Sequence, residues 1–403
     1  MKYKLFNQLL MFLSSIVLSA QAVAVSVDCN SGPPGALSMA VASAAPGTTI
    51  DVKGTCHESV AITTNDLTLV GNSSGSKAII SGFFPGDRLV VDGAVRVNII
   101  GFVVEKGVFG IQAVGNASFS LTDVDVADNI LGIEINKGST ASVSGDVSIT
   151  GSRVFGLQVL TGSKLNLEEN ATLTIANNFL GSQVSINSTL FAGNRSKIMV
   201  MDNTTIGFSV NTGSTAMLFN ADFHSKGNGL DGLDVVSHSN FEVDGESTVI
   251  SESNSRDGIS IDNSTLNMFG FFSSAAGLPR IISHANTGNG ILVESTSKFD
   301  VGRNSSVASH HNGDAGVRLD DGSSAVIQRA EIHSNNGVLP RNDDHDEDKN
   351  NDHNRAADVV VTFGSRVSFN QEADNDDNVT PNMIGLALCD RSSLSRGDVH
   401  CKR

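Results

Sequence analysis

Titratable side chains recur six positions before a repeating glycine in the second half of the chain. This column consists of Lys226, Glu252, His284, His310 and Asp352. Imidazole and carboxylate groups at one repeated position can exchange protons with a substrate or bind a transition metal. Glu252, His284 and His310 are therefore the candidate catalytic residues, and His284 with His310 is the candidate transition-metal pair. The alternative is an exposed turn at which polar residues simply collect.

Two acidic runs near the C-terminal end offer a different chemistry. The first lies in an insertion at 339–355, and the second follows at 372–378. Their candidate metal ligands are Asp343, Asp344, Asp346, Asp348, Asp374 and Asp376. Clustered carboxylate oxygens in an exported protein suit Ca²⁺, which takes about six to eight oxygen ligands. Ca²⁺ is therefore the candidate cofactor, and the alternative is a solvated, charged loop that binds no cofactor.

A repeat that runs through most of the chain must position these side chains. In each unit a glycine is followed seven residues later by a serine, and apolar and polar residues alternate between them. The pairs are Gly132/Ser139, Gly156/Ser163, Gly181/Ser188, Gly207/Ser214, Gly232/Ser239, Gly290/Ser297, Gly316/Ser323 and Gly385/Ser392. A period of two is typical of β-strands. Strands this short cannot bury an apolar face alone, so equivalent strands must stack in register.

An asparagine stands four residues before the glycine in several of these units. The members of the column are Asn177, Asn203, Asn228, Asn254, Asn286 and Asn312. Asparagine tolerates the left-handed backbone of a tight turn, and its amide can bond to a stacked copy of itself. We therefore predict an all-β fold, a right-handed parallel β-helix of about 11–13 rungs with these asparagines as an internal ladder. A β-sandwich with regularly spaced strands is the alternative.

The first residues predict export. Lys2 and Lys4 precede an apolar stretch, and Ala20-Gln21-Ala22 offers a cleavage site, so 1–22 is a predicted signal peptide. A retained membrane anchor is the alternative. No later apolar run is long enough for a transmembrane helix. The mature protein, a single domain over 23–403, is expected to be secreted or periplasmic and monomeric.

Both ends of the predicted coil carry features of a cap. Residues 36–45 read as a short helix that would cover the open N-terminal edge, and 385–403 would form the last rung and its cap. The four cysteines stand as one pair near each end, namely Cys29 with Cys56 and Cys389 with Cys401. In an exported protein this spacing favours two local disulfides, although other pairings remain open.

Charge and aromatic content restrict the partners. The net charge is −16, and removal of a signal peptide with two lysines makes it two units more negative. Such a surface disfavours nucleic acid and anionic membranes, and it would repel polyuronates unless a cation intervened. The chain has no Trp, and its one tyrosine, Tyr3, lies in the predicted signal peptide. Sugar rings usually stack on Trp or Tyr, so this composition argues against a glycan enzyme.

The stretch 36–71 and the Asn-x-x-x-Gly-Ile repeats between about 105 and 337 resemble bacterial right-handed β-helix repeat proteins of the pectin-lyase-like superfamily. The resemblance covers nearly the whole mature chain. It implies the fold but no single activity, since that superfamily includes lyases, hydrolases, epimerases and adhesins. Enzyme motifs match only loosely, because Asp320-Asp321 lacks the accompanying hydrolase elements and Asp343–Asp346 lacks the proline of the epimerase motif.

The sequence therefore favours an exported, non-catalytic scaffold that contacts a glycan or a cell-surface component. One alternative is a Ca²⁺-assisted polysaccharide lyase or related carbohydrate-active enzyme. Another is a periplasmic metal-binding β-helix that uses His284 and His310.

Overall fold

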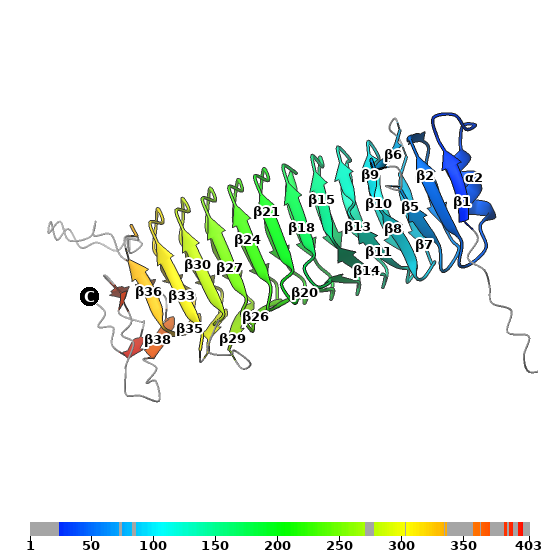
Figure 1. Ribbon diagram of the computed structural model, residues 1–403. Coiled ribbons are helices and arrows are strands. Elements are labelled where there is room, and N and C mark those ends of the chain that lie inside the picture. The colour runs from blue at the N-terminus through cyan, green and yellow to red at the C-terminus, as the bar shows by residue number, and fades with distance from the viewer. Residues whose placement is uncertain are drawn as a thin grey trace, which may run out of the picture.

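The chain winds repeatedly through three parallel sheets, here called A, B and C, and forms a right-handed parallel β-helix of about 12 turns (Figure 1). The computed structural model describes residues 24–71, 75–82, 86–270, 278–302, 304–333, 335–336, 358–362, 364–370, 383–384, 387–389 and 394–397. The predictions on the signal peptide at 1–22, on the insertion at 339–355 and on its aspartates, and on Asp374 and Asp376, lie outside these residues. The fold class predicted from the repeat is confirmed.

Each rung contributes one strand to each sheet, in the order A, B, C. Sheet A contains β1 Ala24–Asp28, β2 Thr49–Lys53, β5 Thr68–Val70, β8 Val97–Ile100, β11 Ser118–Thr122, β14 Thr140–Ser144, β17 Lys164–Leu167, β20 Thr189–Gly193, β23 Thr215–Phe219, β26 Asn240–Asp244, β29 Thr265–Phe269, β32 Lys298–Val301, β35 Ser324–Gln328, β38 Arg366–Asn370 and β41 Leu394–Gly397. Sheet B contains β3 Thr55–His57, β6 Ala78–Ser81, β9 Phe102–Glu105, β12 Asp125–Ala127, β15 Asp146–Thr150, β18 Thr172–Ala176, β21 Lys197–Met201, β24 Asp222–Lys226, β27 Thr248–Glu252, β30 Arg280–His284, β33 Ser306–His310, β36 Ala330–His333 and β39 Met383–Ile384. Sheet C contains β4 Val60–Ile62, β7 Leu89–Asp92, β10 Phe109–Val114, β13 Leu131–Ile135, β16 Phe155–Val159, β19 Leu180–Val184, β22 Phe208–Val210, β25 Leu233–Val236, β28 Ile259–Asp262, β31 Ile291–Glu294, β34 Val317–Leu319, β37 Val359–Val361 and β40 Ala387–Cys389.

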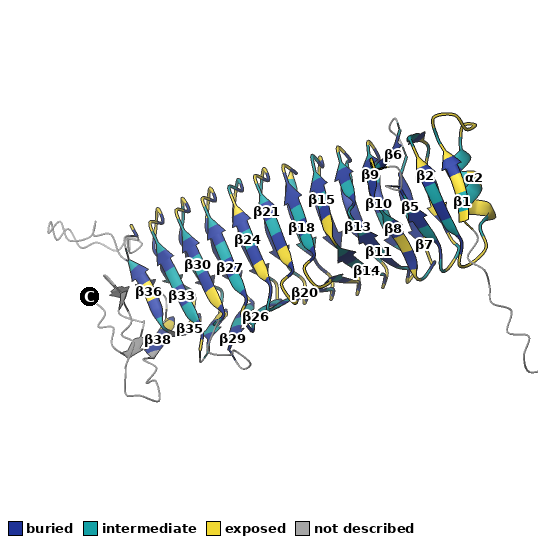
Figure 2. Cartoon of the chain, viewed as in Figure 1, coloured by how far each residue is buried: buried dark blue, intermediate teal, exposed yellow. Residues whose placement is uncertain are grey.

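The alternation of side chains along each strand builds the core. In β26, Phe241 and Val243 are buried while their neighbours are only partly covered, and the same pattern recurs along the sheets (Figure 2). Inward side chains stack from rung to rung, as where Phe223 meets Phe208 and Phe241 edge-on. Burial of each such side chain contributes about 1.5–3 kcal/mol. The outward side chains are therefore left free for surface chemistry.

A serine ladder forms the corner between sheets C and A. The backbone N–H of Ser163 donates to the hydroxyl of Ser188 at 3.2 Å, and Ser188 donates to Ser214 at 3.1 Å. The same bond repeats rung by rung as far as Ser365. The serine seven residues after the glycine recurs because each hydroxyl satisfies a buried backbone donor of the preceding rung.

An asparagine ladder forms the corner between sheets B and C. The backbone N–H and the side-chain amide of Asn254 both donate to Oδ1 of Asn286, at 3.0 and 2.9 Å. Asn286 repeats both bonds to Asn312, at 3.1 and 3.0 Å. The members of the ladder are Asn178, Asn203, Asn228, Asn254, Asn286, Asn312 and Asn335, and Oδ1 of Asp358 accepts the last bonds.

One predicted member of the asparagine ladder, Asn177, is wrong. Asn177 is exposed, with a left-handed φ of 57°, and the buried amide in that rung belongs to Asn178. The turn before Gly181 is one residue shorter than the later turns, so counting four residues back from the glycine misses the ladder position. Asn177 instead occupies the first turn position, which Asp202 takes one rung later.

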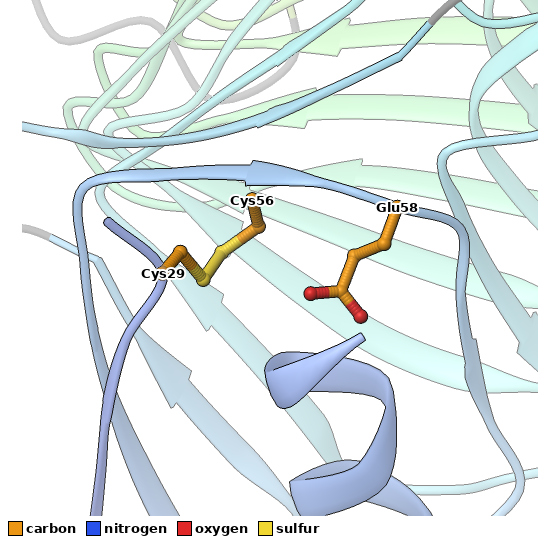
Figure 3. Close-up of side chains that lie close together, drawn as sticks. All are labelled: Cys29, Cys56 and Glu58. Atoms are coloured by element: carbon orange, nitrogen blue, oxygen red, sulfur yellow. A yellow bond between two sulfur atoms is a disulfide. The ribbon is translucent and has the colours of Figure 1, made fainter. Parts of the chain in front are cut away.

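The N-terminal cap is a helix held by a carboxylate and a disulfide. Helix α2, Ala36–Ser43, buries Leu37 against the first rung. Glu58 accepts hydrogen bonds from the backbone N–H groups of Leu37 and Ser38, at 3.1 and 2.7 Å, and so satisfies the helix N-terminus (Figure 3). The helix ends two residues before the predicted boundary, because Ala44 is extended and a proline follows at 46.

The predicted N-terminal disulfide is confirmed, since Cys29 and Cys56 are bonded (Figure 3). At the other end Cys389 lies buried in β40 and is also disulfide-bonded. Its predicted partner, Cys401, lies outside the described residues. In the part of the chain described here, no helix has the length and apolar character needed to cross a membrane.

Candidate functional site

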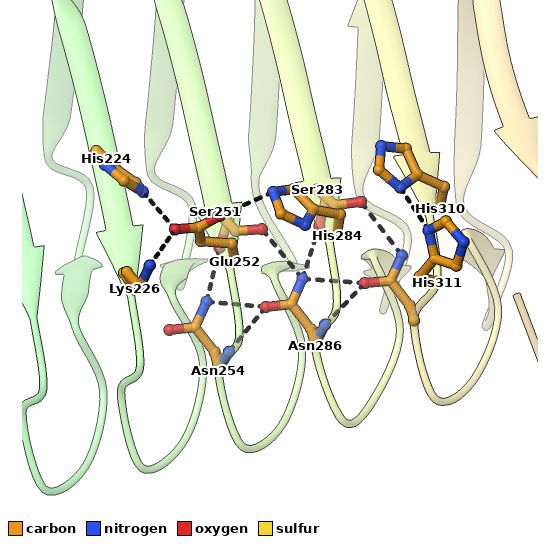
Figure 4. Close-up of polar contacts among 11 residues, drawn as sticks. His224, Lys226, Ser251, Glu252, Asn254, Ser283, His284, Asn286, His310 and His311 are labelled. Atoms are coloured by element: carbon orange, nitrogen blue, oxygen red, sulfur yellow. Dashed lines mark hydrogen bonds and ion pairs between the residues drawn. The ribbon is translucent and has the colours of Figure 1, made fainter.

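Glu252, at the end of β27, lies at the centre of an ion-pair network on sheet B. Its Oε1 lies 2.8 Å from Nζ of Lys226 and 3.2 Å from Nε2 of His224, both on β24. Its Oε2 lies 2.8 Å from Nε2 of His284, on β30 (Figure 4). The hydrogen bond from Lys226 is the main cause of a lowered pKa of Glu252. A carboxylate with both oxygens engaged anchors its neighbours and is a poor proton donor.

A stack of imidazole rings continues from this network. The rings of His284 and His310 are stacked with centroids 5.2 Å apart, and His310 stacks on His333 at 5.6 Å. Nδ1 of His310 also lies 2.9 Å from Nδ1 of His311 (Figure 4). Burial, followed by the charges of the three neighbouring histidines, lowers the pKa of His310. The lowered pKa favours the neutral ring, which keeps a nitrogen lone pair for a proton or a metal.

The structure brings most of the predicted titratable column together. Lys226, Glu252, His284 and His310 are register partners on successive strands of sheet B. The next position is occupied by His333, which sequence reasoning missed. The predicted member of the column after His310 is Asp352, six residues before Asp358, and it lies outside the described residues. The insertion separates β36 from β37 in the sequence, so a count back from Asp358 does not reach β36. The position that follows His310 on sheet B is therefore set by strand pairing and not by a fixed distance from the glycine.

A second set of titratable groups lies on the outer face of sheet C and was not predicted as a site. Asp262 and Glu294, at the ends of β28 and β31, are register partners. The backbone N–H of Asp320 donates to the carbonyl of Val293 at 2.8 Å, which places Asp320 beside Glu294 in the next rung. The sequence signal is an acid four residues after the glycine in three consecutive repeats.

Burial and mutual repulsion hold two of these carboxyl groups protonated to a higher pH than usual. Burial raises the pKa of Asp234, on β25, to about 6, and the charges of Asp262 and Glu294 add to the shift. Burial also raises the pKa of Glu294, together with the charges of Asp262, Asp257 and Asp320. Carboxyl groups with raised pKa values in a polar cluster are typical of acid–base sites.

Neighbouring groups fix the orientation of Asp320. The guanidinium of Arg318 lies 3.2 Å from its Oδ2, and the hydroxyl of Thr362 donates to its Oδ1 at 2.8 Å. Glu294 is only partly buried and remains accessible from solvent. Glu294 thus lies beside Asp320, which is oriented by Arg318 and Thr362. Such a pair of carboxyl groups can donate a proton and stabilise a positive charge.

The raised pKa of Asp234 predicts a pH-dependent gain in stability for the D234N variant. The folded protein binds this proton more tightly than the unfolded chain, so the carboxylate destabilises the fold increasingly as the pH rises from about 4 to about 6. We expect D234N to be more stable by up to about 3 kcal/mol at pH 7.5 and nearly unchanged at pH 4. Denaturation of both proteins at the two pH values measures this. D146N, at an exposed carboxylate of sheet B, is the control, and equal pH dependence in all three proteins would contradict the prediction.

The described residues bring one group of three ligand atoms close enough together for a metal ion, namely those of Cys29, Cys56 and Glu58. Both sulfur atoms are in the disulfide, and Glu58 caps α2. These residues therefore do not form a metal site. The Ca²⁺ role of the acidic runs stays a prediction, because their aspartates lie outside the described residues.

Comparison with known proteins identifies similarity of fold. No family model matches the chain, and no curated protein matches it. Among solved structures, a pectate lyase is 13% identical with a TM-score of 0.42, over 79% of this chain and 80% of that one. The A-module of a mannuronan C-5 epimerase from Azotobacter vinelandii is 14% identical with a TM-score of 0.46, over 91% and 94%. The Dettilon tailspike protein is 12% identical with a TM-score of 0.49, over 90% and 68%.

Proposed function

We propose that this protein is an exported carbohydrate-active enzyme that hydrolyses a neutral glycan at the outer face of sheet C. The observation that carries the proposal is the position of the partly buried Glu294 between Asp262 and Asp320 on adjacent rungs, where burial and these charges raise its pKa. Export is supported by the disulfide between Cys29 and Cys56, since such bonds persist in oxidising compartments.

The roles follow from the environment of each carboxyl group. Glu294, whose raised pKa favours the protonated form, donates its proton to the glycosidic oxygen as the bond to the anomeric carbon breaks. Asp320, oriented by Arg318 and Thr362, bonds to or stabilises the cationic anomeric carbon. Water then attacks that carbon and returns the proton to Glu294. Neighbouring rungs are about 4.8 Å apart, which is close to the separation of about 5–5.5 Å between the carboxyl groups of retaining glycosidases.

The charge of the site selects the substrate class. Asp234, Asp262, Glu294 and Asp320 repel the carboxylates of a polyuronate, and the chain as a whole carries a net charge of −16. A neutral polysaccharide avoids this repulsion, and its hydroxyl groups can donate to the ionised acids. We therefore propose an enzyme in place of the non-catalytic scaffold that the sequence favoured, because the carboxyl groups of Asp262, Glu294 and Asp320 lie on successive rungs.

The decisive experiment measures the release of reducing ends from a panel of neutral polysaccharides. We expect hydrolysis by the wild type, and a loss of about 10²–10⁴-fold in kcat for E294Q with binding retained. The matched control is E242Q, at a partly buried glutamate on the outer face of sheet A, which should keep full activity. If E294Q were as active as the wild type, or if the wild type bound neutral glycans without cleaving any, the enzymatic proposal would be wrong.

A further inference from the structure

We propose that His310 and His311 form a Cu²⁺-binding site, separate from the carboxyl groups of sheet C. The site lies at the end of β33, where sheet B meets the turn that contains the asparagine ladder (Figure 4). Its two ligand atoms are the Nδ1 atoms of the two rings, which face each other at 2.9 Å. The two atoms are within hydrogen-bonding distance of each other, and a bound metal ion would replace that hydrogen bond.

The separation of the two nitrogen atoms indicates the metal. Imidazole nitrogen binds first-row metals at about 2.0–2.1 Å, so a separation of 2.9 Å corresponds to an N–metal–N angle of about 90°. That angle suits the tetragonal geometry of Cu²⁺. A tetrahedral Zn²⁺ site would need the nitrogen atoms about 3.3 Å apart.

Neighbouring rings hold this pair in place. His310 lies between the stacked rings of His284 and His333, which restrict its rotation. His311 occupies the first turn position with a left-handed φ of 56°, and its ring meets His310 edge-on with centroids 5.1 Å apart. The ligands are therefore positioned before the metal binds, which reduces the entropy lost on binding.

The site is open enough for a metal ion to enter from solvent and to bind further ligands. His311 is exposed and His310 is partly exposed, so a hydrated ion can reach the nitrogen atoms from solvent. The ring of His333 lies 6.4 Å from that of His311, edge-on. Water can fill the remaining equatorial positions of the ion.

Titration of the full mature protein with Cu²⁺ tests the site, with calorimetry for affinity and electron paramagnetic resonance for the ligands. We expect one tetragonal Cu²⁺ with nitrogen ligands. The H311A variant should bind at least tenfold more weakly and lose one nitrogen from the spectrum. It should fold normally, because alanine already occupies the equivalent turn position at Ala285 with φ 56°.

Two controls distinguish this site from other histidines. H238A removes an exposed turn histidine at φ 62° on another corner of the coil and should bind Cu²⁺ like the wild type. The double variant H345A/H353A removes the histidines of the acidic insertion and should also bind normally. Unchanged binding in H311A, or loss of binding only in H345A/H353A, would overturn the proposal.

Discussion

Replacing Gly258 with alanine is expected to destabilise the central rungs by at least about 3 kcal/mol. A Cβ atom at this position would lie 2.6 Å from the backbone carbonyl oxygen of Gly290 in the next rung. It would also approach the hydroxyl of Ser283 and lie 2.6 Å from the side-chain amide of Asn286. The carbonyl and the amide belong to hydrogen-bonded ladders and cannot retreat, so the two rungs must separate.

Two further variants isolate this steric cause. G162A is the control, because Gly162 has a left-handed φ of 69° and an added Cβ would contact nothing within 4 Å. G162A should lose only about 1–2 kcal/mol of stability, which is the cost of placing a side chain in the left-handed conformation. The double variant G258A/S283A should recover part of the loss, since it removes the nearest obstructing atom. Thermal unfolding measures all three, and equal losses in G258A and G162A would show that packing between rungs is not the cause.

The same contact explains why a glycine repeats through the chain. In rung after rung, the added Cβ would meet the carbonyl oxygen of the equivalent glycine one rung on, as at Gly232 with Gly258. The sequence could predict the fold because the close approach at the glycine, the serine hydroxyl and the asparagine amide each act locally and recur in most of the repeats. Where one turn is a residue shorter, as before Gly181, the same counting failed and gave Asn177 in place of Asn178.

The candidate site was less accessible to sequence reasoning, for a physical reason. The alternation on each strand shows that Asp234 and Glu294 point outward, and it says nothing about how deeply they are covered. The burial of Asp234 depends on side chains about 25 residues away in the neighbouring rungs, such as Ser209. The predicted column was placed correctly as far as His310, but the pairing of Glu252 with Lys226 changes its chemistry from a proton donor to an anchor.

The asparagine ladder connects the two sites. In a single rung the chain runs from His284, at the end of β30, through the turn that contains Asn286 and into β31, which ends at Glu294. That turn is rigid only while its buried amide remains bonded, because the alternative is a set of unsatisfied polar groups inside the coil. A change at Asn286 should therefore disturb the imidazole stack and the carboxyl cluster together.

The N286A variant is expected to lose about 3–5 kcal/mol of stability. The side-chain amide of Asn286 donates to Asn312, to the carbonyl of Ser251 and to the hydroxyl of Ser283, at 3.0, 3.1 and 3.0 Å. Its Oδ1 accepts from the backbone and side chain of Asn254. Alanine removes all five bonds, and each buried group left without a partner costs about 1–3 kcal/mol.

Because each rung of a solenoid contacts only its neighbours, the damage should stay local. We expect faster hydrogen exchange at the amide of Asn254 and in β30 and β31, with little change in distant rungs such as β11. N267A is the matched control, since Asn267 lies on the outer face of sheet A and donates one 3.3 Å bond to Asn240. It should cost less than about 1 kcal/mol. If N286A cost no more than N267A, the amide column would be a by-product of turn composition, and the rigidity that positions both sites would have to come from the apolar core.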